Sequence, residues 1–113
     1  MEPTPVLGEQ FRTVAGRKIL FDDEGFLWHV DDWAEEVAGE LAQESGVAEL
    51  SVEQWRVIRF LREYYFENGR SPLNRAIVAG MGMSLLELEH LFPGGIRHGA
   101  KRLAGLPNPK RCS

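Results

Sequence analysis

Apolar side chains recur every three or four residues along much of this chain, a spacing that is typical of helices with one buried face. The two longest repeats consist of Trp33, Val37 and Leu41 in a helix expected at residues 33–44, and of Trp55, Ile58, Leu61 and Tyr65 in a helix expected at residues 52–67. Stripes of this kind are more often core than ligand site, so we interpret both as buried.

Polar residues ahead of the apolar repeats predict where the helices begin. The expected caps are Asp31 or Asp32 for the first helix, Ser51 with Gln54 for the second, Ser71 before Pro72 for a third, and Ser84 with Glu87 for a short fourth. The second and fourth have the spacing of a capping box. A last helix is expected at residues 96–104, with Arg97, Lys101 and Arg102 on its outer face and Gly105 after its end.

The N-terminal part of the chain predicts strands. Residues 17–20 and 26–30 are interpreted as two short strands, because the acidic, glycine-ending stretch 22–25 between them supplies turn chemistry. Residues 1–10 lack periodicity and are expected to be a mobile leader. The pattern therefore predicts one mainly helical domain, residues 1–113, with an N-terminal β-hairpin docked on helices.

The composition is that of an ordinary globular domain, with 43% hydrophobic and 27% charged residues. No apolar run approaches the roughly 18 residues of a membrane span. There is also no basic-then-apolar leader of the secretory kind. One free cysteine and no such leader predict a reducing cytoplasm.

The net charge of −4 is unevenly distributed. All 17 acidic residues precede position 91, whereas residues 91–113 hold five Lys and Arg residues and no acid. The basic end can fold back onto the acidic body, or it can steer the C-terminus toward an acidic partner or a nucleic acid. The sequence leaves both interpretations open.

The only cysteine, Cys112, is the penultimate residue. Pro107 and Pro109 prevent a regular helix or a central strand around them. Residues 105–113 are therefore expected to form an extended, exposed arm that reaches roughly 20 Å. A lone thiol has no intrachain disulfide partner, and a zinc site needs several further ligands, so no metal is expected. The remaining chemistry is nucleophilic, by an ordinary thiol that is activated inside a partner's pocket.

Other motifs give weaker signals. Glu87 and His90 have the spacing of half a metal site, but the chain has no second copy of it. Residues 72–92 resemble a helix-turn-helix in outline. Its second helix, residues 84–91, holds two acids and no Arg or Lys, which argues against direct nucleic-acid binding through it.

Several blocks of sequence carry a family resemblance. They are residues 23–27 with 32–33, Trp55 with residues 60–65, residues 91–95, and residues 103–109 with Cys112. In these blocks the chain resembles the DsrC/TusE/DsvC family of sulfur-relay proteins. The dissimilatory branch of that family has a second cysteine where this chain has Lys101, so the likeness is to the one-cysteine, TusE-like branch. Gln54 stands where many members have His.

The resemblance implies an orthogonal helical bundle with an N-terminal β-hairpin and a flexible C-terminal arm. It also implies a sulfurtransferase-type carrier without a cofactor, with a persulfide on Cys112 and a role in tRNA wobble-uridine 2-thiolation. The implied donor is a TusBCD-like complex and the implied acceptor a tRNA 2-thiouridylase, with dissimilatory sulfite reductase as a further partner. Lys101, Arg102, Lys110 and Arg111 are expected to orient the arm or dock partners. The alternative is a regulatory or interaction protein of sulfur metabolism, associated with sulfite reductase or DNA, that transfers no sulfur.

Overall fold

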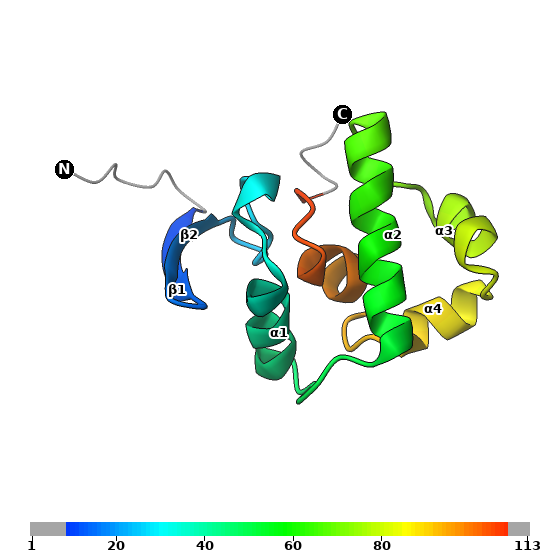
Figure 1. Cartoon of the computed structure of the whole chain (residues 1–113), viewed down its shortest axis with the longest axis horizontal. Coiled ribbons are helices and arrows are strands. Elements are labelled where there is room, and N and C mark those ends of the chain that lie inside the picture. The colour runs from blue at the N-terminus through cyan, green and yellow to red at the C-terminus, as the bar shows by residue number, and fades with distance from the viewer. Residues whose placement is uncertain (1–8, 109–113) are drawn as a thin grey trace.

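The computed structural model describes residues 9–108 of the chain (Figure 1). Its elements, in chain order, are the strands β1 (Gln10–Val14) and β2 (Arg17–Phe21), the 3-10 helix η1 (Val30–Asp32), the helices α1 (Glu35–Glu44), α2 (Val52–Asn68), α3 (Asn74–Met81) and α4 (Leu85–Leu91), and the π-helix η2 (Gly95–Lys101). The prediction of a mainly helical chain with an N-terminal hairpin is confirmed.

The longest helix, α2, runs through the middle of the molecule (Figure 1). The hairpin and α1 lie on one side of it, and α3 and α4 lie on the other. η2 packs against both α2 and α4, so it joins the central helix to the last α-helix. The chain that follows η2 then meets α2 from the side that faces α1 and the hairpin (Figure 1).

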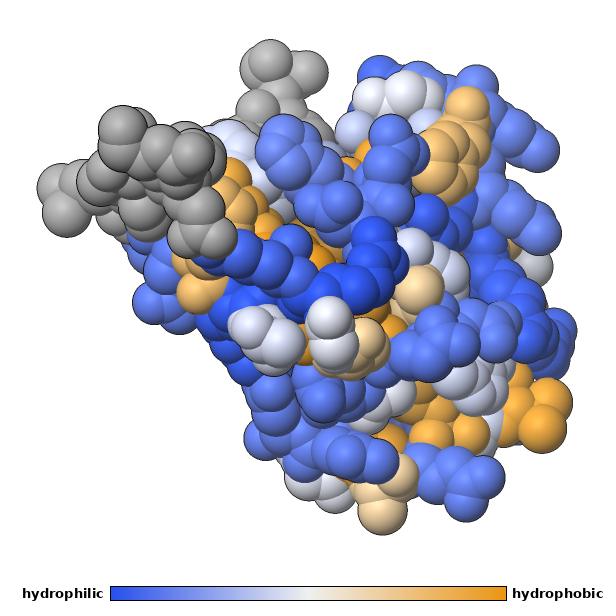
Figure 2. All heavy atoms as spheres, turned by 60° about the vertical axis from the view of Figure 1, so that its left-hand side comes forward, coloured by the Kyte–Doolittle hydropathy of each residue, from blue (hydrophilic) through white to orange (hydrophobic). Residues whose placement is uncertain are grey.

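One hydrophobic core joins these elements. Its fully or almost fully buried members include Val14, Phe21, Leu41, Leu61, Ile77, Leu88 and Ile96. These residues come from both strands, all four α-helices and η2, so these seven elements share one core. Figure 2 shows a face that is mostly hydrophilic, with hydrophobic side chains visible in smaller areas. Within residues 9–108, no helix combines the length and the apolar character needed to cross a membrane.

The hairpin differs from the prediction in its partner strand. β2 pairs antiparallel with β1, and this pairing takes the last residue of the expected leader into the sheet. The turn between the strands has positive φ at Ala15 (52°) and Gly16 (74°), as a two-residue type I′ turn requires. The strand expected at residues 26–30 is wrong, since within that stretch Leu27 forms an isolated bridge to Phe21.

Both predicted capping boxes are confirmed. Ser51 Oγ accepts a hydrogen bond from the Gln54 N–H while Gln54 Oε1 accepts one from the Ser51 N–H, and Ser84 and Glu87 do the same. Gln54 has a second role, because its Nε2 donates to the Leu91 carbonyl at 2.8 Å. The buried amide therefore joins the start of α2 to the end of α4.

The other two expected caps are wrong. Asp31 and Asp32 lie inside η1, so neither has the extended backbone of an N-cap residue, and α1 is preceded by Ala34. α3 is preceded by the extended residue Leu73 instead of Ser71. In both places an apolar residue occupies the cap position, so these starts depend on packing and not on a local side-chain bond.

The last helix, expected at residues 96–104, is a π-helix over residues 95–101 with helical backbone continuing at residues 102 and 103. Its predicted apolar face is confirmed by the burial of Ile96, Ala100, Leu103 and Ala104. The outward orientation expected of Lys101 is wrong, because this side chain is only 8% exposed and its Nζ donates to the Pro72 carbonyl at 3.0 Å. A π-helix makes wider turns than an α-helix, so a residue that α-helical spacing places outside can rotate inward.

Candidate functional site

The candidate site is the C-terminal end of the chain, where the sequence places its only thiol. Lys110, Arg111 and Cys112 lie outside the described residues. The structure therefore defines the site through residues 103–108, which we call the root segment. These residues contact Trp33 just after η1, the β2–η1 loop, α2 and η2, all of which precede them in the chain.

Two side chains hold backbone carbonyls at the start of the root segment. Trp33 Nε1 donates to the Leu103 carbonyl at 2.7 Å, and Arg62 Nη1 donates to the Ala104 carbonyl at 2.9 Å. The Arg62 guanidinium also lies 4.1 Å from the centroid of the Trp33 ring, in a cation–π contact. Burial lowers the pKa of Arg62 from its ordinary value, and the carboxylate of Asp31 opposes this shift. The Arg62 guanidinium therefore holds the start of the root segment through the Ala104 carbonyl and contacts the Trp33 ring.

The next two residues fasten the root segment to the core. Gly105 has a φ of +72°, and a Cβ at this position would lie 2.5 Å from Trp33 Cδ1. Both the conformation and the close contact therefore require glycine. Leu106 is fully buried, and its N–H donates to the Lys101 carbonyl at 3.2 Å. The prediction that a free arm starts at Gly105 is wrong for residues 105–108.

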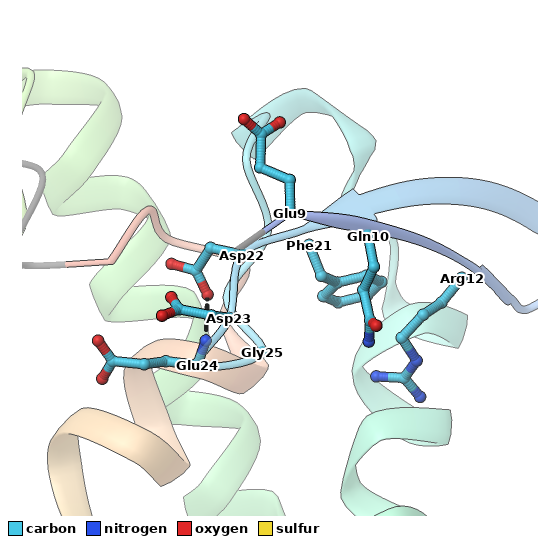
Figure 3. A pocket seen from close by; sticks show the side chains of 8 residues that line it. All are labelled: Glu9, Gln10, Arg12, Phe21, Asp22, Asp23, Glu24 and Gly25. Carbon is cyan, nitrogen blue, oxygen red and sulfur yellow. Dashed lines mark hydrogen bonds between the residues drawn. The ribbon is translucent and has the colours of Figure 1, made fainter. Parts of the chain in front are cut away.

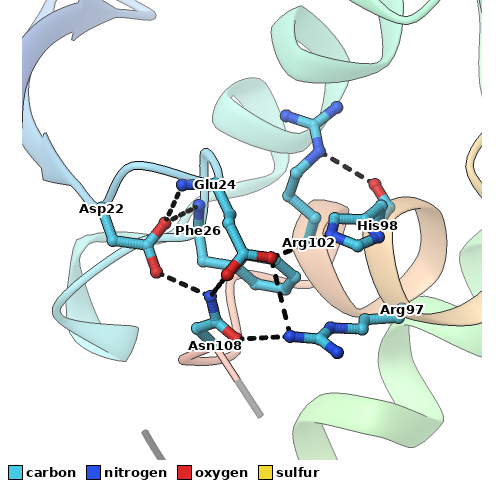
Figure 4. A network of polar contacts seen from close by, with 7 residues as sticks. All are labelled: Asp22, Glu24, Phe26, Arg97, His98, Arg102 and Asn108. Atoms are coloured by element: carbon cyan, nitrogen blue, oxygen red, sulfur yellow. Dashed lines mark hydrogen bonds and ion pairs between the residues drawn. The ribbon is translucent and has the colours of Figure 1, made fainter. Parts of the chain in front are cut away.

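Asn108 lies between two prolines, and its side-chain amide is bonded through both its nitrogen and its oxygen (Figure 4). The residue is 3% exposed. Its Nδ2 donates to Asp22 Oδ2 and Glu24 Oε2, both at 3.0 Å, and its Oδ1 accepts from Arg97 Nη2 at 3.1 Å. Carboxylates only accept and a guanidinium only donates, so these partners fix which way the amide faces. We call Asn108, Asp22, Glu24 and Arg97 the Asn108 clamp.

Further contacts hold both carboxylates of the clamp in place. Asp22 Oδ1 accepts the backbone N–H groups of Glu24 and Phe26, each at 2.9 Å. The turn expected at residues 22–25 is confirmed, because the Gly25 N–H donates to the Asp22 carbonyl at 3.1 Å and Gly25 has a φ of 85°. The same turn presents Asp22 to Asn108. Glu24 Oε1 lies 3.1 Å from His98 Nε2 and 3.6 Å from Arg97 Nη2. The clamp therefore ties the β2–η1 loop to η2 and to the root segment (Figure 4).

Two of the four cations expected to dock partners lie within the described residues, and both are engaged by the chain itself. Arg102 Nε donates to the His98 carbonyl at 2.9 Å, and its Nη2 donates to Ser45 Oγ at 2.6 Å. Burial lowers the pKa of Arg102, and the carboxylate of Glu44 opposes the shift. Lys101 is the buried donor described above, so only its outward orientation is wrong. The role of all four cations in orienting the arm or docking partners stays a prediction.

A pocket of about 480 Å³ opens beside the clamp (Figure 3). It is lined by Glu9, Gln10, Arg12, Phe21, Asp22, Asp23, Glu24 and Gly25. Most of its charged groups are carboxylates, and two of them, Asp22 and Glu24, also belong to the clamp. A cationic group in this pocket would therefore meet the same carboxylates that hold Asn108.

A comparison with known protein families shows what kind of chain carries this arrangement. The family model described as "DsrC like protein" matches residues 13–113. The chain belongs to the DsrC-like family. The family resemblance inferred from the sequence is confirmed.

Relatives of this DsrC-like chain have two kinds of name. The dissimilatory-type sulfite reductase subunit gamma of Nitratidesulfovibrio vulgaris (strain Hildenborough) is 36% identical over 100 residues, which cover 88% of this chain and 95% of the relative. The sulfurtransferase TusE of Sodalis glossinidius is 38% identical over 104 residues, which cover 86% and 95%. The crystal structure of the oxidized gamma-subunit of the dissimilatory sulfite reductase (DsrC) from Archaeoglobus fulgidus matches with a TM-score of 0.81 and 35% identity, over 92% of this chain and 100% of that one.

Sequence reasoning found the terminal thiol of this DsrC-like chain but missed the clamp. Asn108 was taken as part of an extended arm, and Asp22 as part of a hairpin turn. A signal was nevertheless present, because an acidic cluster at residues 22–24 and a basic C-terminal end predict that the two meet. The ion pair of Arg97 with Glu24 is one such contact.

Proposed function

We propose that this DsrC-like chain is a sulfur carrier that holds the transferred sulfur as a persulfide on Cys112. The observation that supports this best is the position of the only cysteine, four residues beyond the firmly held Asn108. A relative that covers most of the chain is named a sulfurtransferase. A thiol four positions beyond a firmly held residue is suited to enter a partner's active site.

The proposed transfer is an exchange at sulfur. The Cys112 thiolate attacks the outer sulfur of a donor persulfide, R–S–SH, and a new S–S bond forms on Cys112. The S–S bond of the donor breaks, and the donor leaves as the thiolate R–S⁻, so the step has no net oxidation or reduction. A thiolate of the acceptor then takes the outer sulfur by the same exchange, which regenerates the Cys112 thiolate.

The partners of this cycle are proposed from the TusE-like resemblance. The donor would be a TusBCD-like complex and the acceptor a tRNA 2-thiouridylase, which places the sulfur on a wobble uridine. The chain's own cations near the terminus, Lys110 and Arg111, would orient the thiol in the donor's pocket or balance negative charge there.

The proposal is tested by incubating the protein with a low-molecular-weight persulfide and weighing the intact chain by mass spectrometry. The expected product carries the mass of one added sulfur atom, and digestion places it on Cys112. The matched control is Cys112→Ser, which keeps the size of the side chain and removes the nucleophile. Equal loading of the control, or no loading of the natural chain, would show that the carrier assignment is wrong.

A second candidate function is a docking subunit that transfers no sulfur, because a relative is named as a subunit of sulfite reductase. A chain that ends at Asn108 separates the two functions. It keeps the buried Leu106 and the clamp, so the body stays folded. A carrier loses all sulfur transfer on this truncation, whereas a docking subunit keeps its affinity for its partner, measured by calorimetry.

A further inference from the structure

We propose that Asn108 is the positioning residue of the carrier, because the clamp fixes the chain four positions before Cys112. The consequence for sulfur transfer rests on the proposed function, while the geometry rests on the described contacts alone. The clamp draws on three separate parts of the chain, namely the β2–η1 loop, η2 and the root segment.

The neighbours of Asn108 explain why a side chain, and not the backbone, fastens the chain at this position. Pro107 and Pro109 have no backbone N–H, so this stretch cannot be fastened by pairing as a strand. The Asn108 amide supplies two N–H donors in place of the missing backbone groups, and both point at carboxylates. Hydrogen bonds to charged acceptors are stronger than neutral ones, which suits an anchor of a single residue.

The carboxylates of the clamp are also held by contacts other than Asn108. Asp22 Oδ1 accepts two backbone N–H groups of its own loop, while Asp22 Oδ2 accepts from Asn108. Glu24 Oε1 lies near His98 and Arg97, while Glu24 Oε2 accepts from Asn108. Each carboxylate therefore joins Asn108 to another part of the body (Figure 4).

The position of the anchor sets how far the thiol can travel. Cys112 is four positions beyond Asn108, so the Cα of Cys112 stays within about 14 Å of the Cα of Asn108. Without the clamp, the next fixed residue is the buried Leu106, and six residues allow about 20 Å. The clamp therefore reduces roughly threefold the largest volume within which the length of the chain allows the thiol to lie. A partner's reacting sulfur has to approach the face that carries the β2–η1 loop and η2.

The experiment measures directly how far Cys112 lies from the body, and it requires no sulfur transfer. One spin label is attached to Cys112, which needs no engineering because the chain has no other cysteine. A second label is attached to an exposed position on α1 through Glu36→Cys. Electron spin resonance then gives the distance distribution between the two labels. In the Asn108→Ala variant we expect the long-distance edge of the distribution to move out by about 6 Å.

The matched control is Asn68→Ala, which removes an exposed asparagine whose Nδ2 donates to the Tyr64 carbonyl at the end of α2. Its distance distribution should be that of the natural chain. An unchanged distribution in Asn108→Ala, or the same widening in the control, overturns the proposal. Should Asn108→Ala not fold, Arg97→Ala removes the donor to Asn108 Oδ1, and it is expected to widen the distribution by a smaller amount.

Sulfur loading is measured on the same Asn108 variant and natural chain, without spin labels and without Glu36→Cys, and it separates this inference from the proposed function. Asn108→Ala should load sulfur from a low-molecular-weight persulfide within twofold of the natural rate, because a small donor reaches Cys112 wherever it lies. Loss of loading in this variant with a normal melting temperature would overturn the positioning role. Absence of loading in the natural chain counts against the carrier function alone, since the distance measurement is independent of it.

Discussion

Replacing Leu106 by alanine tests whether the root segment belongs to the folded core. Leu106 is fully buried, although it follows the last helix and precedes a proline. The substitution removes about three methylene equivalents, which corresponds to about 2.4 kcal/mol of transfer free energy at ~0.8 kcal/mol each. The cavity that remains adds to this loss, so we expect the free energy of unfolding to fall by about 2.5–5 kcal/mol.

This loss is measured by urea unfolding, followed by circular dichroism at 222 nm, a standard helix wavelength. The matched control is Leu86→Ala on α4, where the leucine is 66% exposed and the expected change lies within about 0.5 kcal/mol. If a free arm started at Gly105, Leu106→Ala and Leu86→Ala would both leave the free energy of unfolding nearly unchanged. If Leu106→Ala unfolds at the same urea concentration as the natural chain, the packing of the root segment described above is wrong.

Two further predictions concern single contacts. Gly105→Ala should cost at least about 2 kcal/mol more than Gly16→Ala in thermal unfolding, because both glycines have positive φ but only the first has Trp33 within 4 Å of a new Cβ. Equal melting temperatures of the two variants would contradict the close contact. Gln54→Ala should cost about 2 kcal/mol in urea unfolding, since it removes half of a capping box and leaves the Leu91 carbonyl without its amide donor. A cost below about 0.5 kcal/mol would show that this amide does not join the helices.

Features that depend on neighbouring residues could be predicted from the sequence. The capping boxes at Ser51 and Ser84 involve residues three positions apart, so no knowledge of the fold was needed to find them. The apolar faces of α1 and α2 follow the 3.6-residue period for the same reason. Gln54 and Val57 are buried on α2 outside the predicted stripe, because tertiary neighbours widen the face that a helix must cover.

Features that depend on distant residues could not be predicted in this way. Asn108 and Asp22 are 86 positions apart, and the opposite charges of the two regions predict that the regions meet but not that these two side chains bond. The inward turn of Lys101 results from the π-helical turns of η2, whose spacing the α-helical period does not describe. The hairpin partner was misplaced because the acidic loop after β2 has turn chemistry, while the actual turn at Ala15 and Gly16 lacks the usual Asn-Gly or Asp-Gly signal.

The short tether beyond Asn108 has a consequence for how tightly partners need to bind. Once a partner rests against the body, its reacting group and the thiol share a small volume, which corresponds to an effective concentration that is at least roughly millimolar. Under the proposed function, transfer within the complex would then need no high-affinity pocket for residues 109–113. A carrier built in this way can use weak, short-lived complexes, release each partner quickly, and visit donor and acceptor in turn with the same few residues.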